Sequence, residues 1–180
     1  LPAGALRAQP EALVTPPAAD VLRIVVIGSS TAAGQGVDDP DSAWVERYRR
    51  FLVRVHPACE VINLAVSGYS TYQLQPTGFR TPPGRPLVDS KHNISAALAL
   101  GPSAIIVNVP SNDAVSNFTI LEQSENYERL VAEAARANVP IWVSTTQPRD
   151  IDGGQRQNLI TMRDWIRDRF AAHALDFWTG

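Results

Sequence analysis

Short runs of hydrophobic residues alternate along this chain with longer segments in which hydrophobic residues recur every three or four positions. The first run, residues 22–27, is rich in β-branched side chains and ends at Gly28, which is typical of a strand buried on both faces of a parallel sheet. Further strands are predicted at residues 61–65, 104–108, 141–145 and 175–178. Strands that alternate with helices in this way predict one α/β domain with a five-stranded parallel sheet and right-handed crossovers.

The segments between the strands predict amphipathic helices. The first begins near Ser42 and ends at His56, which a proline follows. Its hydrophobic stripe is formed by Trp44, Tyr48, Phe51, Leu52 and Val55. Later helices are predicted at about residues 93–100 and 122–137, and a last one is marked by Leu159, Met162, Ile166 and Phe170. The connection over residues 66–90 is rich in glycine and proline, and its length predicts an open functional loop.

Residues 1–20 show neither the alternation of hydrophobic and polar residues typical of a strand nor the spacing of three to four residues typical of a helix, and they are rich in alanine and proline. We therefore expect an extended arm that precedes a domain over residues 21–180. The 16 lysine and arginine residues against 18 aspartate and glutamate residues give a net charge of −2, which lacks the basic surface of a nucleic-acid-binding protein. No hydrophobic run is long enough to cross a bilayer. Cys59 is the single cysteine, and no cluster of His, Cys and Asp has the spacing of metal ligands, so we expect neither a metal nor a cofactor.

Ligands of open α/β sheets bind outside the carboxyl ends of the strands, so the loops after the first three strands are the expected place for function. These loops contain Gly28-Ser29-Ser30-Thr31, then Ser67-Gly68 after Asn63, and Ser111-Asn112-Asp113. They offer a hydroxyl, a glycine amide and a carboxamide at one edge of the sheet. Acyl transfer needs such groups, namely a nucleophile and hydrogen-bond donors for a developing oxyanion.

The three blocks, in this order and each at a strand end, resemble those of the SGNH (GDSL) hydrolases, with Ser29 where that family usually has aspartate. The resemblance covers residues 22–113 and implies a flavodoxin-like three-layer α/β/α sandwich with strand order 2-1-3-4-5. It also implies that Ser30 is the nucleophile. The N–H of Ser30, the N–H of Gly68 and the side chain of Asn112 would then form the oxyanion hole. Asn63 and Asp113 are expected to be structural.

The same family places its general base and orienting acid in an Asp-x-x-His motif beyond the fifth strand, and none of the three histidines fits that motif. We expect His56 and His173 near helix ends away from the catalytic edge, which leaves only His92 on the catalytic side. The catalytic His and Asp are therefore expected to lie outside this chain. A chain that stops short of the natural one, a separate completing piece and an inactive protein are the three explanations, and the stop within a predicted strand favours the first two.

The expected function is that of a serine esterase that forms an acyl-enzyme on a small polar ester such as an acetylated carbohydrate. Ser29, Gln147 and Arg149 are further candidates for substrate contact. A non-catalytic carbohydrate- or ligand-binding module on the same fold is the alternative. Nucleotide binding is a third hypothesis, although the loop over residues 28–34 matches neither of the common phosphate-binding glycine patterns. The Ala-, Arg- and Pro-rich composition suggests a bacterial source, and we expect a secreted or periplasmic location.

Overall fold

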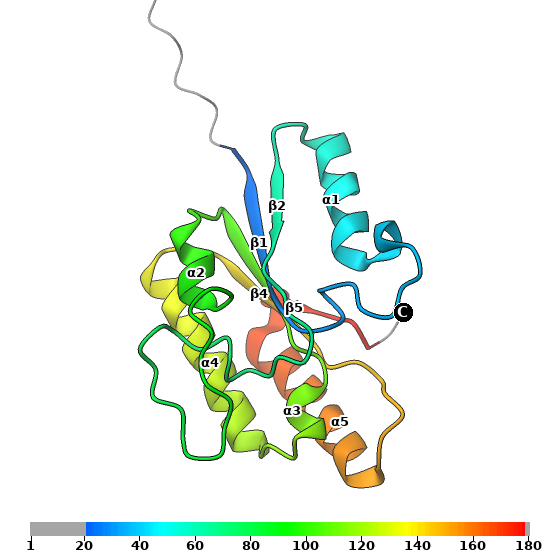
Figure 1. Ribbon diagram of the computed structural model, residues 1–180, viewed down its shortest axis with the longest axis vertical. Helices are drawn as coiled ribbons and strands as arrows, with labels where there is room; N and C mark the ends of the chain where they lie inside the picture. Colours follow the sequence, from blue (N-terminus) through cyan, green and yellow to red (C-terminus); the bar gives the residue numbers. More distant parts are fainter. Residues whose placement is uncertain (1–20, 179–180) are drawn as a thin grey trace, which may run out of the picture.

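The computed structural model describes residues 21–178, and the arm predicted for residues 1–20 lies outside the described residues. Its centre is a five-stranded sheet with the order β2-β1-β3-β4-β5 (Figure 1), in which every strand pair is parallel. The strands are β1 (Arg23–Gly28), β2 (Glu60–Asn63), β3 (Ala104–Asn108), β4 (Ile141–Ser144) and β5 (Ala174–Leu175). The predicted fold class and strand order are confirmed.

The fifth strand is shorter than the predicted residues 175–178 and begins earlier. Its ladder with β4 ends at Leu175, whose carbonyl accepts a hydrogen bond of 2.8 Å from the N–H of Thr145. Beyond it, the N–H of Phe177 donates to the hydroxyl of Thr145 at 2.9 Å. The chain therefore leaves the sheet because a side chain, rather than the next backbone carbonyl, accepts its hydrogen bond.

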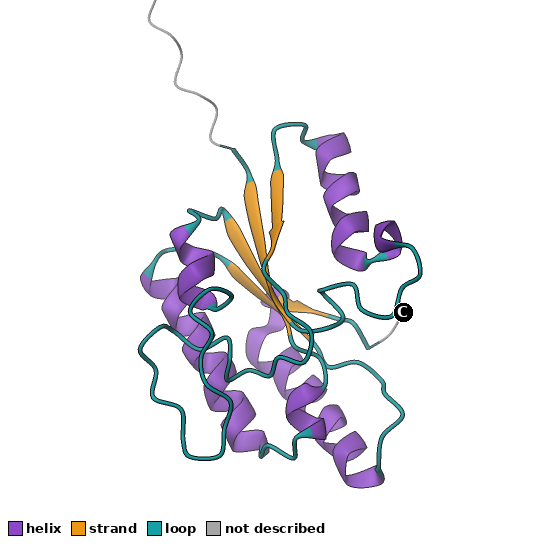
Figure 2. Cartoon of the chain, viewed as in Figure 1, coloured by secondary structure: helices purple, strands orange, loops and turns teal. Residues whose placement is uncertain are grey.

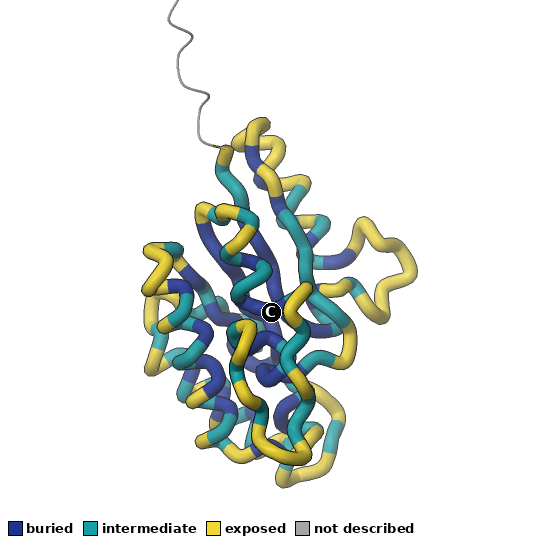
Figure 3. Tube along the Cα trace, turned by 60° about the vertical axis from the view of Figure 1, so that its left-hand side comes forward, coloured by how far each residue is buried: buried dark blue, intermediate teal, exposed yellow. Residues whose placement is uncertain are grey.

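Helices cover the two faces of the sheet unequally (Figure 2). One face packs against α2 (Ile94–Ala99), α4 (Ile120–Arg136) and α5 (Gly153–Phe170), and the other packs against α1 (Trp44–Val55). Short helical turns complete the described chain: η1 (Pro40–Ser42), α3 (Asn112–Val115) and η2 (Ala171–His173). The buried positions follow the central strands and the helix sides that face them (Figure 3). Helix α4 begins two residues before the predicted start, because Thr119 and Glu122 form a capping box.

The predicted stripe of α1 is wrong at two positions. Leu52 is buried, whereas Phe51 is 50% and Val55 is 48% exposed. Helix α1 packs beside the edge strand β2, so no further strand lies under that flank of the helix. An apolar stripe along a helix therefore identified the helix but overestimated the width of the face that the sheet buries.

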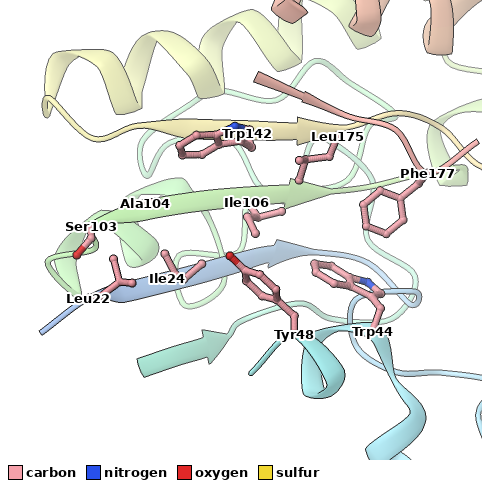
Figure 4. Close-up of a pocket in the computed structure, with 10 residues that line it drawn as sticks. All are labelled: Leu22, Ile24, Trp44, Tyr48, Ser103, Ala104, Ile106, Trp142, Leu175 and Phe177. Atoms are coloured by element: carbon pink, nitrogen blue, oxygen red, sulfur yellow. The ribbon is translucent and has the colours of Figure 1, made fainter. Parts of the chain in front are cut away.

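The described residues cover the sheet face under α1 only partly, and an apolar hollow of about 590 Å³ lies beside the helix (Figure 4). Its walls include the aromatic side chains of Trp44, Tyr48, Trp142 and Phe177. Parallel sheets are normally covered on both faces. The hollow lies where the helical layer formed by α1 does not reach across the sheet. None of the three motif loops that follow β1, β2 and β3 contributes a residue to it.

The connection over residues 66–90 is not the open loop that its composition predicts, because its first half is packed into the domain. Thr71, Leu74 and Gln75 are fully buried. The carboxylate of Asp113 accepts a hydrogen bond of 3.0 Å from the N–H of Thr71, and the hydroxyl of Thr71 accepts one of 2.9 Å from Asn126. These hydrogen bonds give polar groups of this irregular segment partners inside the core, which lowers the cost of burying it.

Candidate active site

The turn after β1 places Ser30 at the carboxyl edge of the sheet. A Cβ on Gly28 would lie 2.2 Å from the carbonyl oxygen of Asn108, so only glycine allows this close approach of β1 to β3. The next N–H, that of Ser29, donates to the same carbonyl at 2.9 Å. Ser29 is 1% exposed and does not line the pocket described below, so the expectation that it contacts substrate does not fit the structure.

Ser30, Gly68 and Asn112 come from three separate loops and line one cavity of about 470 Å³. Its other lining residues are Thr31, Gln35, Ser67, Ser111, Gln147, Pro148 and Arg149. The carboxyl ends of β1, β2 and β3 are neighbours in the sheet, which is why loops so far apart in sequence meet here. The cavity therefore contains a hydroxyl, a glycine amide and a carboxamide together with a polar wall.

Two of the three candidate oxyanion donors, Gly68 and Asn112, are held by local backbone structure. Gly68 has a φ of +86° and an added Cβ would meet nothing within 4 Å, so glycine is required for the backbone conformation and not for space. Asn112 starts α3, and its Nδ2 donates a hydrogen bond of 2.8 Å to the carbonyl of Tyr69. A primary amide has two N–H groups, so the second remains available for an oxyanion in the cavity.

The loop after β4 closes the cavity on its remaining side. Gln147 accepts a hydrogen bond of 3.1 Å from the hydroxyl of Thr31, and Nη1 of Arg149 donates one of 3.1 Å to the hydroxyl of Ser111. Both residues thus lie where the sequence placed them, beside the candidate nucleophile. Thr31 and Ser111 belong to the motif blocks, but the sequence predicted no contact for either of them.

Comparison with known proteins decides the family. Residues 26–179 match the model of the GDSL-like Lipase/Acylhydrolase family. The chain belongs to this family. A comparison with curated proteins finds no significant match, and the similar solved structures are distant in sequence.

Three of these structures illustrate the shared fold. The psychrotrophic esterase EstA from Pseudoalteromonas sp. is 16% identical with a TM-score of 0.62, and the match covers 87% of this chain and 77% of EstA. The SGNH-hydrolase family esterase AlinE4 is 18% identical with a TM-score of 0.61, covering 88% of this chain and 77% of AlinE4. A two-domain esterase, CEX, active on acetylated mannans is 14% identical with a TM-score of 0.60, covering 87% of this chain and 37% of that protein.

In this GDSL-like chain, none of the three histidines, all of which lie in the described residues, hydrogen-bonds to Ser30. His56 is the carboxyl-terminal cap of α1. His173 lies next to the start of β4, where its Nδ1 is 2.9 Å from the carbonyl oxygen of Ile141 and its ring stacks on Trp142. Both positions are at the opposite edge of the sheet from the cavity.

His92 corrects one statement of the sequence analysis, because Asp89-Ser90-Lys91-His92 does have the Asp-x-x-His spacing. Its Nδ1 lies 2.7 Å from Oδ2 of Asp89, which also accepts a hydrogen bond from the hydroxyl of Tyr69. The bonds from Tyr69, Lys91 and His92 lower the pKa of Asp89 to about 2, and burial followed by the Asp89 contact raises the pKa of Tyr69 to about 12. The pair lies between β2 and α2, not after β5, and does not line the cavity.

Asp113 follows Asn112 directly but is separated from the cavity. It is 3% exposed, and burial raises its pKa to about 6 against the opposing effect of its hydrogen bonds with Thr71. The two neighbouring residues of the third motif block therefore have different positions: Asn112 lines the cavity, and Asp113 is hydrogen-bonded to Thr71 in the buried part of the 66–90 connection.

Within residues 21–178, no group of three or more His, Cys, Asp or Glu side chains is placed to hold a metal ion. Over the same residues, no helix combines the length and the apolar character needed to cross a membrane.

Proposed function

We propose that this chain is a serine esterase that hydrolyses carboxylic esters through an acyl-enzyme. The observation that carries the proposal is that Ser30, Gly68 and Asn112 line one cavity at the carboxyl edge of a GDSL-like fold. In this proposal the hydroxyl oxygen of Ser30 attacks the ester carbonyl. The negative charge on the carbonyl oxygen is stabilised by the N–H groups of Ser30 and Gly68 and by Nδ2 of Asn112.

The reaction then follows from the groups present. The tetrahedral intermediate expels the alcohol and leaves the acyl group on Ser30, and a water molecule attacks this ester to release the acid. The hydroxyl proton of Ser30 passes to a base and then to the departing alcohol. None of the three histidines is hydrogen-bonded to Ser30, so we propose that the base is a histidine that this sequence does not contain.

The polar wall of the cavity supports a short acyl group on a hydroxyl-rich alcohol. Apart from Pro148, its lining side chains are hydroxyls, amides and a guanidinium, which solvate polar groups and offer little surface to a long acyl chain. We propose an acetyl ester of a carbohydrate as the substrate. The activity of CEX, a protein of the same fold, on acetylated mannans is consistent with this choice.

The esterase proposal is tested by measuring whether an acetyl group is transferred to Ser30. The chain is incubated with p-nitrophenyl acetate at neutral pH, with and without imidazole as an external base, and the protein is then examined by peptide mass spectrometry. We expect acetylation of Ser30 that imidazole accelerates, its loss in Ser30→Ala, and no loss in Ser90→Ala, which replaces an exposed serine. Acetate release that exceeds the release by imidazole alone and survives Ser30→Ala would defeat the proposal.

The missing bond to an imidazole keeps a second function open. A non-catalytic module on the same fold would bind acetylated sugars in this cavity without any covalent step. Saturable binding of an acetylated oligosaccharide, together with no acetylation of Ser30 even with imidazole, would favour that module over the esterase.

A further inference from the structure

Within residues 21–178, one charged side chain lines the cavity around Ser30, that of Arg149. All other lining residues are neutral. The guanidinium donates one hydrogen bond of 3.1 Å to Ser111, and it forms no ion pair with any carboxylate of residues 21–178. By contrast, Arg85 and Arg169 are paired with Glu122 and Glu128. Arg149 therefore brings an uncompensated positive charge to the candidate active site.

A second hollow adjoins the cavity at the same arginine. It measures about 460 Å³ and is lined by Pro148, Arg149, Asp150, Arg156 and Trp178. Pro148 and Arg149 belong to both hollows. The guanidinium thus borders both hollows, and the second offers space next to it for part of a substrate larger than the ester group itself.

The hydrogen bond to Ser111 orients the guanidinium and occupies one of its donors. The planar guanidinium carries five N–H groups, so most of its donors remain available to the cavity. Such a fork matches the oxygen atoms of a carboxylate or a phosphate. Of the residues that the structure describes, no acidic side chain lines the Ser30 cavity to repel an anion.

We propose that Arg149 binds an anionic group, a carboxylate or a phosphate, on the alcohol part of the ester that Ser30 attacks. This assignment rests on the proposed esterase function. Because the acyl group of that proposal is acetyl, which is uncharged, the anion belongs to the alcohol. The substrate class is therefore an acetylated acidic sugar or a comparable anionic alcohol.

Binding to the Ser30→Ala chain tests this without any turnover. The probes are singly acetylated methyl glucoside, singly acetylated methyl glucuronoside and acetylated glucose 6-phosphate, and dissociation constants are measured by calorimetry at low salt. We expect one or both anionic esters to bind about tenfold more tightly than the neutral one, since Arg149 is exposed and its pairing is partly screened. The anion with the larger preference identifies the source, and added salt reduces the preference.

Three further variants in the same background assign the effect. Arg149→Gln should remove the preference, and Arg149→Lys should keep part of it, because the charge stays while the fork is lost. Arg47→Gln removes a positive charge from the exposed side of α1, outside both hollows, and should change nothing. Equal affinity for charged and neutral esters, a preference that survives Arg149→Gln, or no saturable binding of any probe would each overturn the proposal.

The two proposals fail in different ways. An anionic preference that depends on Arg149, found without acetylation of Ser30 in the parent chain, would uphold the binding site and defeat the esterase. Acetylation of Ser30 with equal binding of all three probes would do the reverse.

Discussion

Replacement of Glu122 by glutamine tests how the loop behind the candidate site is held. The carboxylate of Glu122 accepts hydrogen bonds from Nε of Arg85 at 2.6 Å, from the hydroxyl of Tyr72 at 3.0 Å and from the N–H of Thr119 at 2.8 Å. It thereby ties the loop over residues 66–90 to the start of α4. The Arg85 bond is the main reason that the pKa of Glu122 is lowered to about 2.

The size of the effect follows from this pKa. A fall from 4.5 to about 2 means that the ionised carboxylate stabilises the fold by at most about 3 kcal/mol at neutral pH. The side chain is 23% exposed, and glutamine keeps one carbonyl oxygen as an acceptor. We therefore expect Glu122→Gln to lower the free energy of unfolding by about 2 kcal/mol at neutral pH.

The stabilisation by the Glu122 carboxylate depends on pH. Because the folded pKa lies below the unfolded one, the stabilisation is complete above the unfolded pKa and is lost as the pH falls through the folded pKa. Less than about half of the stabilisation by the Glu122 carboxylate remains at pH ~3. The difference between the parent and Glu122→Gln should therefore shrink when the two are compared at neutral pH and again at that acidic pH.

Urea-induced unfolding of both proteins at the two pH values measures this difference. Glu125→Gln is the matched control, since Glu125 is exposed on the same helix, and it should change the free energy of unfolding by less than about 0.5 kcal/mol. An equal loss for both variants, or a Glu122→Gln effect that is the same at both pH values, would refute the reasoning.

Three other predictions concern Asn112 in the cavity and two residues near it, His92 and Asp113. Asn112→Ala should slow acetylation of Ser30 by about 10²–10³-fold in the imidazole-assisted assay, and an unchanged rate would remove Asn112 from the mechanism. His92→Ala should leave that rate unchanged, because His92 does not line the cavity; a collapse of the rate would identify a local base. For Asp113, whose folded pKa is raised to about 6, the parent should lose stability relative to Asp113→Asn as the pH rises from about 4 to 7. Urea unfolding across this range measures it, and a constant difference would contradict it.

The sequence by itself determined the central strands of the sheet and the edge at which Ser30, Gly68 and Asn112 lie. A central parallel strand is buried on both faces, so it must be an unbroken apolar run, and β1 and β3 could be read from that local pattern. Ser30, Gly68 and Asn112 could be selected because the residues after such strands reach one edge of the sheet. Both arguments need only neighbours along the chain and the general geometry of parallel sheets.

Only the tertiary structure decided how far individual side chains are buried and which polar side chains contact one another. The exposure of Phe51 depends on where the sheet ends, and the burial of Thr71 depends on Asp113, a residue of another loop. The contact of Arg149 with Ser111 likewise joins positions separated by 38 residues. Such pairings are set by how loops fold back over the strand ends, and because a single polar residue has no periodicity, a local pattern does not specify its partner.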